Sequence, residues 1–395
     1  MRNVWILTLA QAFSACGSII LFTFGGIVGA RIAPAPALST LPLSLTMLGV
    51  AAATLPAAAL TQRIGRRPAL VLGALLGTAG ALGAAWATHH SEFAAFCAAA
   101  IAVGASQAFV LQYRFAATEY VPLESAGKAV SIVMLGTLAA AVIGPDLGDR
   151  TRLLGGWTEF SGTFVALAAL FVVAAAVLSL LQTPVLRSVQ TGGTVRPLSA
   201  IAMQPAFVVA VLAGVSSYAV MVFIMTATPI SMHVIDGMSV AQTKQVISAH
   251  VLAMYLPSLV SGQLIRTLGE KLMMLLGVAL MTVCIAMAVL TGRHFAHYLI
   301  ALILLGVGWN LLFVAGTTLL TRTYSAAERF KVQGVNDFAI FGTQGLMSLL
   351  AGAVVQTLGW AWLNIAGLPL LAATVTGIAW LHARERRSGR VVVRP

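Results

Sequence analysis

The chain has 395 residues, of which 59% are hydrophobic and only 9% charged, and its mean hydropathy is +0.95. Soluble proteins carry roughly a quarter charged residues, so this composition excludes a soluble globular protein and predicts a chain that crosses a membrane many times. The formal net charge of +12 does not indicate a nucleic-acid partner, because the positive residues lie in short runs between apolar segments, where they act as topology signals.

Twelve apolar segments are long enough to cross a bilayer, which takes about 20 residues in a helix. None alternates like a barrel strand, so the sequence predicts an all-α membrane protein. The first apolar run follows Arg2 and is too long for the apolar core of a cleavable signal, so we expect it to be the first spanning helix. The predicted helices cover residues 4–29, 38–61, 68–88, 93–114, 128–147, 160–183, 205–230, 240–264, 271–291, 295–319, 332–355 and 359–381.

The distribution of positive residues predicts the orientation. With the N-terminus in the cytoplasm, all but five of the 23 lysines and arginines fall on the cytoplasmic side. Positive residues favour that side of a membrane, so we expect both termini in the cytoplasm and the chain in a bacterial inner membrane. The five exceptions are Arg31, Arg150, Arg152, Lys244 and Arg293.

The polar stretch "TPVLRSVQTGGTVRPLS" divides the spans six and six. We expect an N-terminal six-helix half over residues 1–184, a cytoplasmic linker over 185–198, a C-terminal half over 199–383 and a basic cytoplasmic tail over 384–395. The halves also resemble each other in sequence: Gly65 of "TQRIGRRPALVLGALLG" matches Gly269 of "IRTLGEKLMMLLGVALM", and Glu124 matches Glu328 at the same offset. Two matches at one offset indicate a parallel internal repeat.

Two repeated six-helix halves resemble the major facilitator superfamily, and the resemblance covers essentially the whole chain. The family signature after the second helix, Gly-x-Leu-Ala-Asp-Arg-x-Gly-Arg-Arg, is matched in part, and Ala58 and Gln62 replace its glycine and its acid. The resemblance implies gating roles for Gln62, Arg63 and Arg66, although Gln62 lacks the charge of the family's latch. "AVIGPDLGD" around Pro145 resembles the fifth-helix motif of exporters.

Sulfur and imidazole side chains recur with helical spacing in the second half. Met221 and Met225 lie four residues apart in the seventh span, as do His250 and Met254 in the eighth, and residues at this spacing share a helix face. A short loop joins the two helices, so both pairs are expected roughly 15 Å deep. Thioether and imidazole groups select Cu(I), whereas methionine is also common filler in apolar helices. Spacing alone therefore leaves copper binding and packing equally open.

These two pairs, together with "LQYRFAATEY" (residues 111–120), resemble the CcoA-like copper importers of the CalT family. The resemblance implies import of copper, as Cu(I), into the cytoplasm for assembly of the cbb3-type cytochrome oxidase, with copper as the transported substrate and copper chaperones as partners on either side. Riboflavin transporters of the same wider family share "YRFAA"-like sequence. The methionine and histidine residues therefore carry the distinction.

Further residues are candidates for the metal path or for gating. Cys16 is a candidate additional ligand, and Met232 with His233 a candidate capture point at the mouth; packing and loop roles are the alternatives. Arg114 and Glu119 are expected to form a charge pair or gate element, and Asp337 to carry a coupling proton or a gate hydrogen bond.

We therefore expect a monomeric copper importer that works by alternating access, with no prosthetic group. The closest alternative is a transporter of riboflavin or a related heterocycle that stacks on Trp309, Tyr113 and Tyr218. A drug exporter and a copper sensor or chaperone that does not transport are weaker alternatives. An enzyme is not expected, because the sequence holds no nucleotide-binding loop, catalytic acid pair or nucleophile with a base. Its three cysteines, Cys16, Cys97 and Cys284, form no disulfide framework or metal-binding motif.

Overall fold

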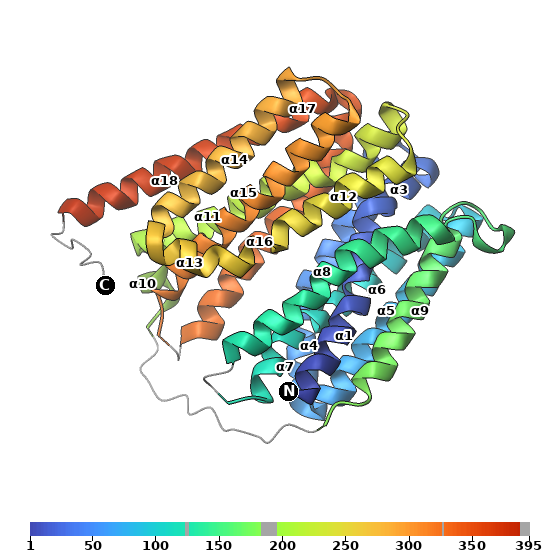
Figure 1. The fold of residues 1–395 in the computed structure, drawn as a ribbon, viewed down its shortest axis with the longest axis horizontal. Coiled ribbons are helices and arrows are strands. Elements are labelled where there is room, and N and C mark those ends of the chain that lie inside the picture. Colours follow the sequence, from blue (N-terminus) through green and yellow to red (C-terminus); the bar gives the residue numbers. More distant parts are fainter. Residues whose placement is uncertain (123–125, 183–195, 326–327, 388–395) are drawn as a thin grey trace.

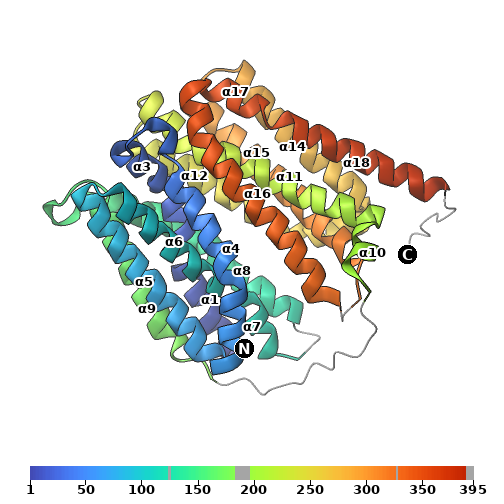
Figure 2. The ribbon, with the colours of Figure 1, turned by 180° about the vertical axis from the view of Figure 1, so that it is seen from behind.

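The fold is entirely helical in the residues that the computed structural model describes, 1–122, 126–182, 196–325 and 328–387. Eleven helical segments are each long and apolar enough to cross a membrane, and a bent pair of helices makes a twelfth. Figures 1 and 2 show two bundles side by side, one blue to green and one yellow-green to red. The predicted all-α fold with twelve spans in two halves is confirmed.

The N-terminal half holds six spans. Its elements are α1 (Arg2–Ser14), α2 (Cys16–Ile20), the π-helix η1 (Leu21–Gly25), α3 (Gly26–Ile32), η2 (Pro36–Leu38), α4 (Leu41–Ile64), α5 (Arg66–His90), α6 (Phe93–Val110), α7 (Tyr113–Glu119), α8 (Ala126–Thr151), η4 (Leu154–Gly156) and α9 (Ser161–Leu178). The first span runs without interruption from α1 to α3, and the fourth extends through α7.

The C-terminal half repeats the arrangement. Its elements are α10 (Leu198–Ala202), α11 (Pro205–Pro229), the π-helix η5 (Ile230–Ile235), α12 (Val240–Tyr255), α13 (Ser258–Leu268), α14 (Glu270–Leu290), α15 (Phe295–Thr321), α16 (Arg329–Thr357), α17 (Gly359–Ile365) and α18 (Leu368–Arg387). Much of the expected linker and most of the expected tail lie outside the described residues, so the domain limits stay a prediction.

The eighth span differs from its prediction as one continuous helix. It bends by 44° between α12 and α13, at Pro257. Proline has no backbone N–H and its ring clashes with the preceding turn, so a helix breaks there.

The internal repeat is visible in the backbone. Gly65 links α4 to α5 with φ 90° and ψ 164°, and Gly269 links α13 to α14 with φ 79° and ψ 157°. Positive φ is readily available only to glycine, so both halves use the same residue for the same tight connection. The second sequence match, Glu124 with Glu328, stays a prediction, because Glu124 lies outside the described residues. Its counterpart Glu328 is buried against the Arg196 guanidinium, which holds the pKa of that carboxyl well below its usual range.

The two halves meet at one end of the bundle. We call this the far end, because it lies opposite the end where α1 begins and α18 ends (Figure 1). There η1 and α3 pack against α11 and η5, α8 against α12, and η2 and α4 against α16. Thr40 accepts a hydrogen bond from the backbone N–H of Gly352, and Lys244 on α12 lies 3.2 Å from Asp146 and 2.9 Å from Asp149, both on α8.

Contact between the halves fades toward the termini end. A Cβ placed on Gly345 of α16 would lie 3.6 Å from Leu48 of α4. Two turns nearer the termini end on the same helix faces, Leu55 and Phe338 are 78% and 76% exposed. The halves are therefore closed against each other at the far end and separated at the other, which is one of the two states of an alternating-access cycle.

Close helix packing inside each half rests on small residues, as at many membrane helix interfaces. A Cβ on Gly104 of α6 would lie 2.1 Å from the carbonyl oxygen of Thr46 on α4. We predict that Gly104→Ala forces α4 and α6 apart and lowers the free energy of unfolding by about 1–3 kcal/mol, as overpacking does. Thermal unfolding of the purified protein in detergent measures this. Gly262→Ala, where a Cβ would meet nothing within 4 Å, is the control; equal melting temperatures would contradict the prediction.

The Lys244 contacts yield a second prediction. Lys244→Gln removes the charge that joins α12 to α8, so the far end should open more often. Spin labels at Leu153→Cys and Gln245→Cys should then show a distance distribution shifted to longer values in pulsed electron paramagnetic resonance. Lys271→Gln breaks an ion pair with Glu385 inside one half and should leave the distribution unchanged. A shift of equal size in both variants would show that loss of charge, rather than of this contact, is responsible.

Candidate functional site

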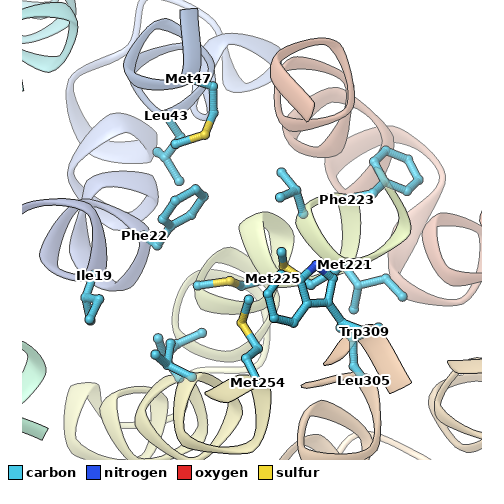
Figure 3. Close-up of a cluster of buried hydrophobic side chains, with 14 of the residues drawn as sticks. Ile19, Phe22, Leu43, Met47, Met221, Phe223, Met225, Met254, Leu305 and Trp309 are labelled. Atoms are coloured by element: carbon cyan, nitrogen blue, oxygen red, sulfur yellow. The ribbon is translucent and has the colours of Figure 1, made fainter. Parts of the chain in front are cut away.

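Three methionines meet where the two halves face each other. Met221 and Met225 of α11 and Met254 of α12 are 3%, 4% and 6% exposed. Figure 3 shows the side chains of Met225 and Met254 pointing toward one another and Met221 beside Trp309. Side chains of the N-terminal half, Ile19, Phe22, Leu43 and Met47, lie opposite them. The predicted shared faces of the two helices are thus brought together at the centre of the molecule.

His250 lies one helical turn before Met254 on α12 and is fully buried. Its Nδ1 is 2.7 Å from the carbonyl oxygen of Leu302 on α15, so this nitrogen donates and the neutral ring keeps Nε2 as an acceptor. Nε2 is buried and has no hydrogen-bond partner among the described residues. A buried imidazole with a free acceptor suits a metal ion or a ligand donor. No cluster of three or more histidine, cysteine or acidic side chains in the described residues is arranged to hold a metal, so any metal site here depends on the methionines.

The break at Pro257 is stabilised by Asn310 of α15. Its Nδ2 donates to the carbonyl oxygen of Met254 and to Oγ of Ser258, both at 2.6 Å, and its Oδ1 accepts from Ser261 at 2.8 Å. The bend frees that carbonyl from its helical partner, and an unpaired carbonyl in a membrane costs several kcal/mol. Asn310 therefore fixes the backbone that carries Met254.

Aromatic side chains form a wall beside the methionines. The rings of Trp309 and Phe313 are stacked at 5.2 Å with an interplanar angle of 14°. Tyr218 stands edge-on to Trp309 at 5.1 Å and to Phe313 at 5.0 Å, and it approaches Phe341 at 6.5 Å. Tyr255 stands edge-on to Trp309 at 6.0 Å. We call these five residues, from four helices, the aromatic wall. The indole Nε1 of Trp309 is buried without a hydrogen-bond partner among the described residues, so it is free to donate to a ligand.

Two charged candidate residues lie in opposite halves. Asp337 precedes Phe341 of the aromatic wall by four residues on α16, so the two share a helix face, and the guanidinium of Arg114 on α7 lies over the ring of Phe115, 4.8 Å from its centre. The expected pair of Arg114 with Glu119 is wrong. The two residues are five positions apart, which places them about 140° apart around a helix of 3.6 residues per turn.

Glu119 instead pairs with Arg66, whose Nε lies 3.0 Å from Oε2 of Glu119 and whose Nη1 donates to Gln112 at 3.0 Å. Arg66 therefore ties α5 to α7 within one half. Gln62 and Arg63 are exposed near the end of α4, and neither side chain makes a hydrogen bond to the described residues. Their gating roles stay a prediction.

The remaining candidate ligands lie away from the methionines. The thiol of Cys16 donates to the carbonyl oxygen of Ala12 at 3.2 Å and lies against α8 near Ala140, inside the N-terminal half. Met232 is fully buried in η5, whereas Nδ1 of His233 is hydrogen-bonded to the carbonyl oxygen of Met238 at 2.7 Å. Their role as a capture point for metal stays a prediction.

Tyr113 also differs from expectation. It is fully buried in the N-terminal half, with its hydroxyl 3.3 Å from Oγ of Ser14, so it offers no stacking face to a cargo. Of the three aromatic residues named for the heterocycle alternative, Tyr218 and Trp309 lie together and Tyr113 does not. A separate cavity of about 320 Å³ lies at the far end, lined by Val28, Arg31, Ile32, Thr88, Ser91, Thr158 and Glu159.

Comparison with known proteins gives the family. The model of the Major Facilitator Superfamily matches residues 7–234 and 210–394. The chain belongs to this superfamily. It is 41% identical to the riboflavin transporter RfnT of Brucella anthropi over 94% of this chain and 93% of that protein. Two uncharacterized MFS-type transporters of Bacillus subtilis, YdeG and YddS, are 30% and 29% identical over 97% of this chain, and over 92% and 91% of their own lengths.

As a member of this superfamily, the protein is a multi-pass secondary transporter embedded in a lipid bilayer. The narrower expectation of a copper importer is not supported by these relatives, of which the one with a named cargo is a riboflavin transporter.

The role of Asn310 can be tested directly. Asn310→Leu leaves the Met254 carbonyl oxygen unpaired inside the bundle, which should cost about 1–3 kcal/mol of unfolding free energy and speed hydrogen exchange of the backbone amides at residues 258–261. Asn364→Leu is the matched control, because the Asn364 amide donates only to Trp360 of its own helix. Exchange that accelerates equally in the two variants would show that Asn310 does not hold the bend.

Proposed function

We propose that this protein is a secondary transporter that carries riboflavin or a closely related planar heterocycle across the bacterial inner membrane by alternating access. The observation that carries the proposal is the 41% identity, over nearly the whole of both chains, with a protein named as a riboflavin transporter. The aromatic wall supports it, because a flat ring system gains about 1–3 kcal/mol for each aromatic side chain on which it stacks.

The arrangement of the halves fits a transport cycle. With both termini in the cytoplasm, as the positive residues predict, the far end is periplasmic, and the structure corresponds to the inward-facing state. A cargo taken up at the far end would then leave toward the termini end, past exposed Leu55 and Phe338. We propose uptake as the direction of net transport and the monomer as the transporting unit.

The test is uptake of radiolabelled riboflavin by bacteria that neither make nor import it. Cells that express the wild type should accumulate the label, and cells with an empty vector should not; equal accumulation would disprove the proposal. Tyr218→Ala should raise KM by about tenfold through loss of one stacking face. Tyr324→Ala changes a tyrosine that bonds to Gln333 near the start of α16 and should transport like the wild type at equal expression.

The methionine cluster favours a second candidate cargo, copper. Met221, Met225 and Met254 converge, His250 keeps a free ring nitrogen, and soft ligands of this kind bind Cu(I). Copper uptake measured in the same cells decides between the two cargoes. Met254→Leu keeps the volume of the side chain and removes its sulfur. If copper enters with the wild type and not with this variant, and riboflavin does not enter at all, copper replaces riboflavin as the cargo, and chaperones on either side become its expected partners.

A further inference from the structure

Four of the five positive residues that depart from the cytoplasmic distribution belong to one network of ion pairs at the far end. Cations and acids alternate along this network in the order Arg150, Asp146, Lys244, Asp149, Arg152, Glu159 and Arg31. Each acid is shared by two cations, and a cation stands at either end. The network therefore holds one more positive charge than negative.

The two ends of this network have different surroundings. The side chain of Arg150 is 77% exposed to solvent. Arg31 instead lines the far-end cavity of about 320 Å³, together with Glu159 and three side chains that carry hydroxyls. Its Nη1 lies 2.7 Å from Oε2 of Glu159, whose Oε1 accepts from Arg152 at 3.3 Å. The guanidinium in the cavity thus has only a share of one carboxylate.

The size and the lining of the cavity suit a small anionic molecule. Ligand sites in proteins begin at about 300 Å³. Nη1 of Arg31 donates to Glu159, which leaves the other N–H groups of the guanidinium to bind an oxyanion through parallel hydrogen bonds. Ser91 is exposed at this cavity, and its hydroxyl is a further donor. The adjacent acid, Glu92, does not line the cavity.

We propose that this cavity binds a small oxyanion through Arg31, and that the bound anion strengthens the closure of the far end. The ligand class is carboxylates and phosphates, carried either by a soluble molecule or by a lipid headgroup at the membrane surface. The cavity lies within the N-terminal half, apart from the methionine cluster and the aromatic wall, so its ligand regulates transport and is not the cargo. The inference holds for either candidate cargo.

The network links the cavity to the contact between the halves. An anion that takes Arg31 leaves Glu159 to Arg152. Arg152 is held loosely on its other side, because its Nε lies 3.7 Å from Oδ1 of Asp149, and it then moves toward Glu159. Asp149 is left to Lys244 of α12, 2.9 Å away. The ion pair that joins α8 of one half to α12 of the other is therefore strengthened.

The first experiment measures binding of inorganic phosphate to the purified full chain in detergent by calorimetric titration, at constant ionic strength set with sodium chloride. Arg31→Gln should bind phosphate at least about tenfold more weakly than the wild type, the effect of one charged hydrogen bond. Arg293→Gln is the matched control and should bind like the wild type. Arg293 is 41% exposed, against 43% for Arg31, and it pairs with Asp236 but lines no part of this cavity. Equal affinity in the wild type and Arg31→Gln would overturn the proposal.

Two further variants should change phosphate affinity in opposite directions. Glu159→Gln removes the carboxylate that competes for Arg31, so phosphate should bind several-fold more tightly. Ser91→Gly keeps the backbone at its positive φ of 57° and removes the hydroxyl, so phosphate should bind several-fold more weakly. Weaker binding by Glu159→Gln would show that the pair is needed intact, which contradicts an anion site on Arg31.

The lipid composition distinguishes the two sources of the anion. The same titration is made in nanodiscs of phosphatidylcholine alone and of phosphatidylcholine with phosphatidylglycerol. Phosphate that binds in both identifies a site for a soluble anion. Binding that is lost only with phosphatidylglycerol identifies the headgroup as the ligand of Arg31. Loss in both kinds of nanodisc would overturn the proposal, because the cavity would not be open in a membrane.

The effect on closure is measured with the spin labels at Leu153→Cys and Gln245→Cys. Saturating phosphate should shift their distance distribution to shorter values when the rest of the chain is wild type. With Lys244→Gln added, phosphate should still bind and leave the distribution unchanged. A distribution that does not respond to bound phosphate, or that shifts equally with Lys244→Gln, would overturn the proposed strengthening of the far end through this network.

Discussion

The pairing of every backbone polar group inside the bundle is the constraint on which the rest of this structure depends, because lipid offers no hydrogen bonds. The bend at Pro257 interrupts this pairing in the eighth span, and Asn310 satisfies one of the freed carbonyls by donating to the Met254 carbonyl oxygen. This hydrogen bond holds a 44° bend next to Met254 and Tyr255, which belong to the candidate site. The site therefore lies where the backbone is irregular, and one amide from the neighbouring helix makes that irregularity stable.

The two halves of the internal repeat share the same backbone geometry at equivalent positions, but the ion pairs there have opposite signs. Both halves turn at a glycine with positive φ, Gly65 or Gly269. Beside the first, Arg66 at the start of α5 pairs with Glu119; beside the second, Glu270 at the start of α14 pairs with Arg322. The signs are swapped, but the mechanical effect is the same, since each pair fastens two helices of one half. Each half is thus held together on its own, and relative motion is left to the interface between the halves.

Hydropathy predicts nearly all of this fold, because a span needs only enough apolar residues to cross a bilayer. Spacing likewise placed Met221 and Met225 on one face. It could not show what lies opposite that face. The aromatic wall joins side chains from α11, α12, α15 and α16, which only packing brings together. The partner of Glu119 was missed for the same reason, since Arg66 is distant in sequence. The dipeptide Leu256–Pro257 was the signal that could have predicted the bend.

The methionine cluster and the aromatic wall are one site, because Met221 lies beside Trp309 (Figure 3). Thioethers serve both cargoes equally: they bind soft metals, and they also pack favourably against aromatic rings. The two proposed cargoes would use different surfaces of this site. A soft metal ion needs the thioethers of Met225 and Met254, which point toward one another (Figure 3), whereas a flat ring needs the faces of the aromatic wall. Substitutions that remove one surface and spare the other therefore separate the two proposals.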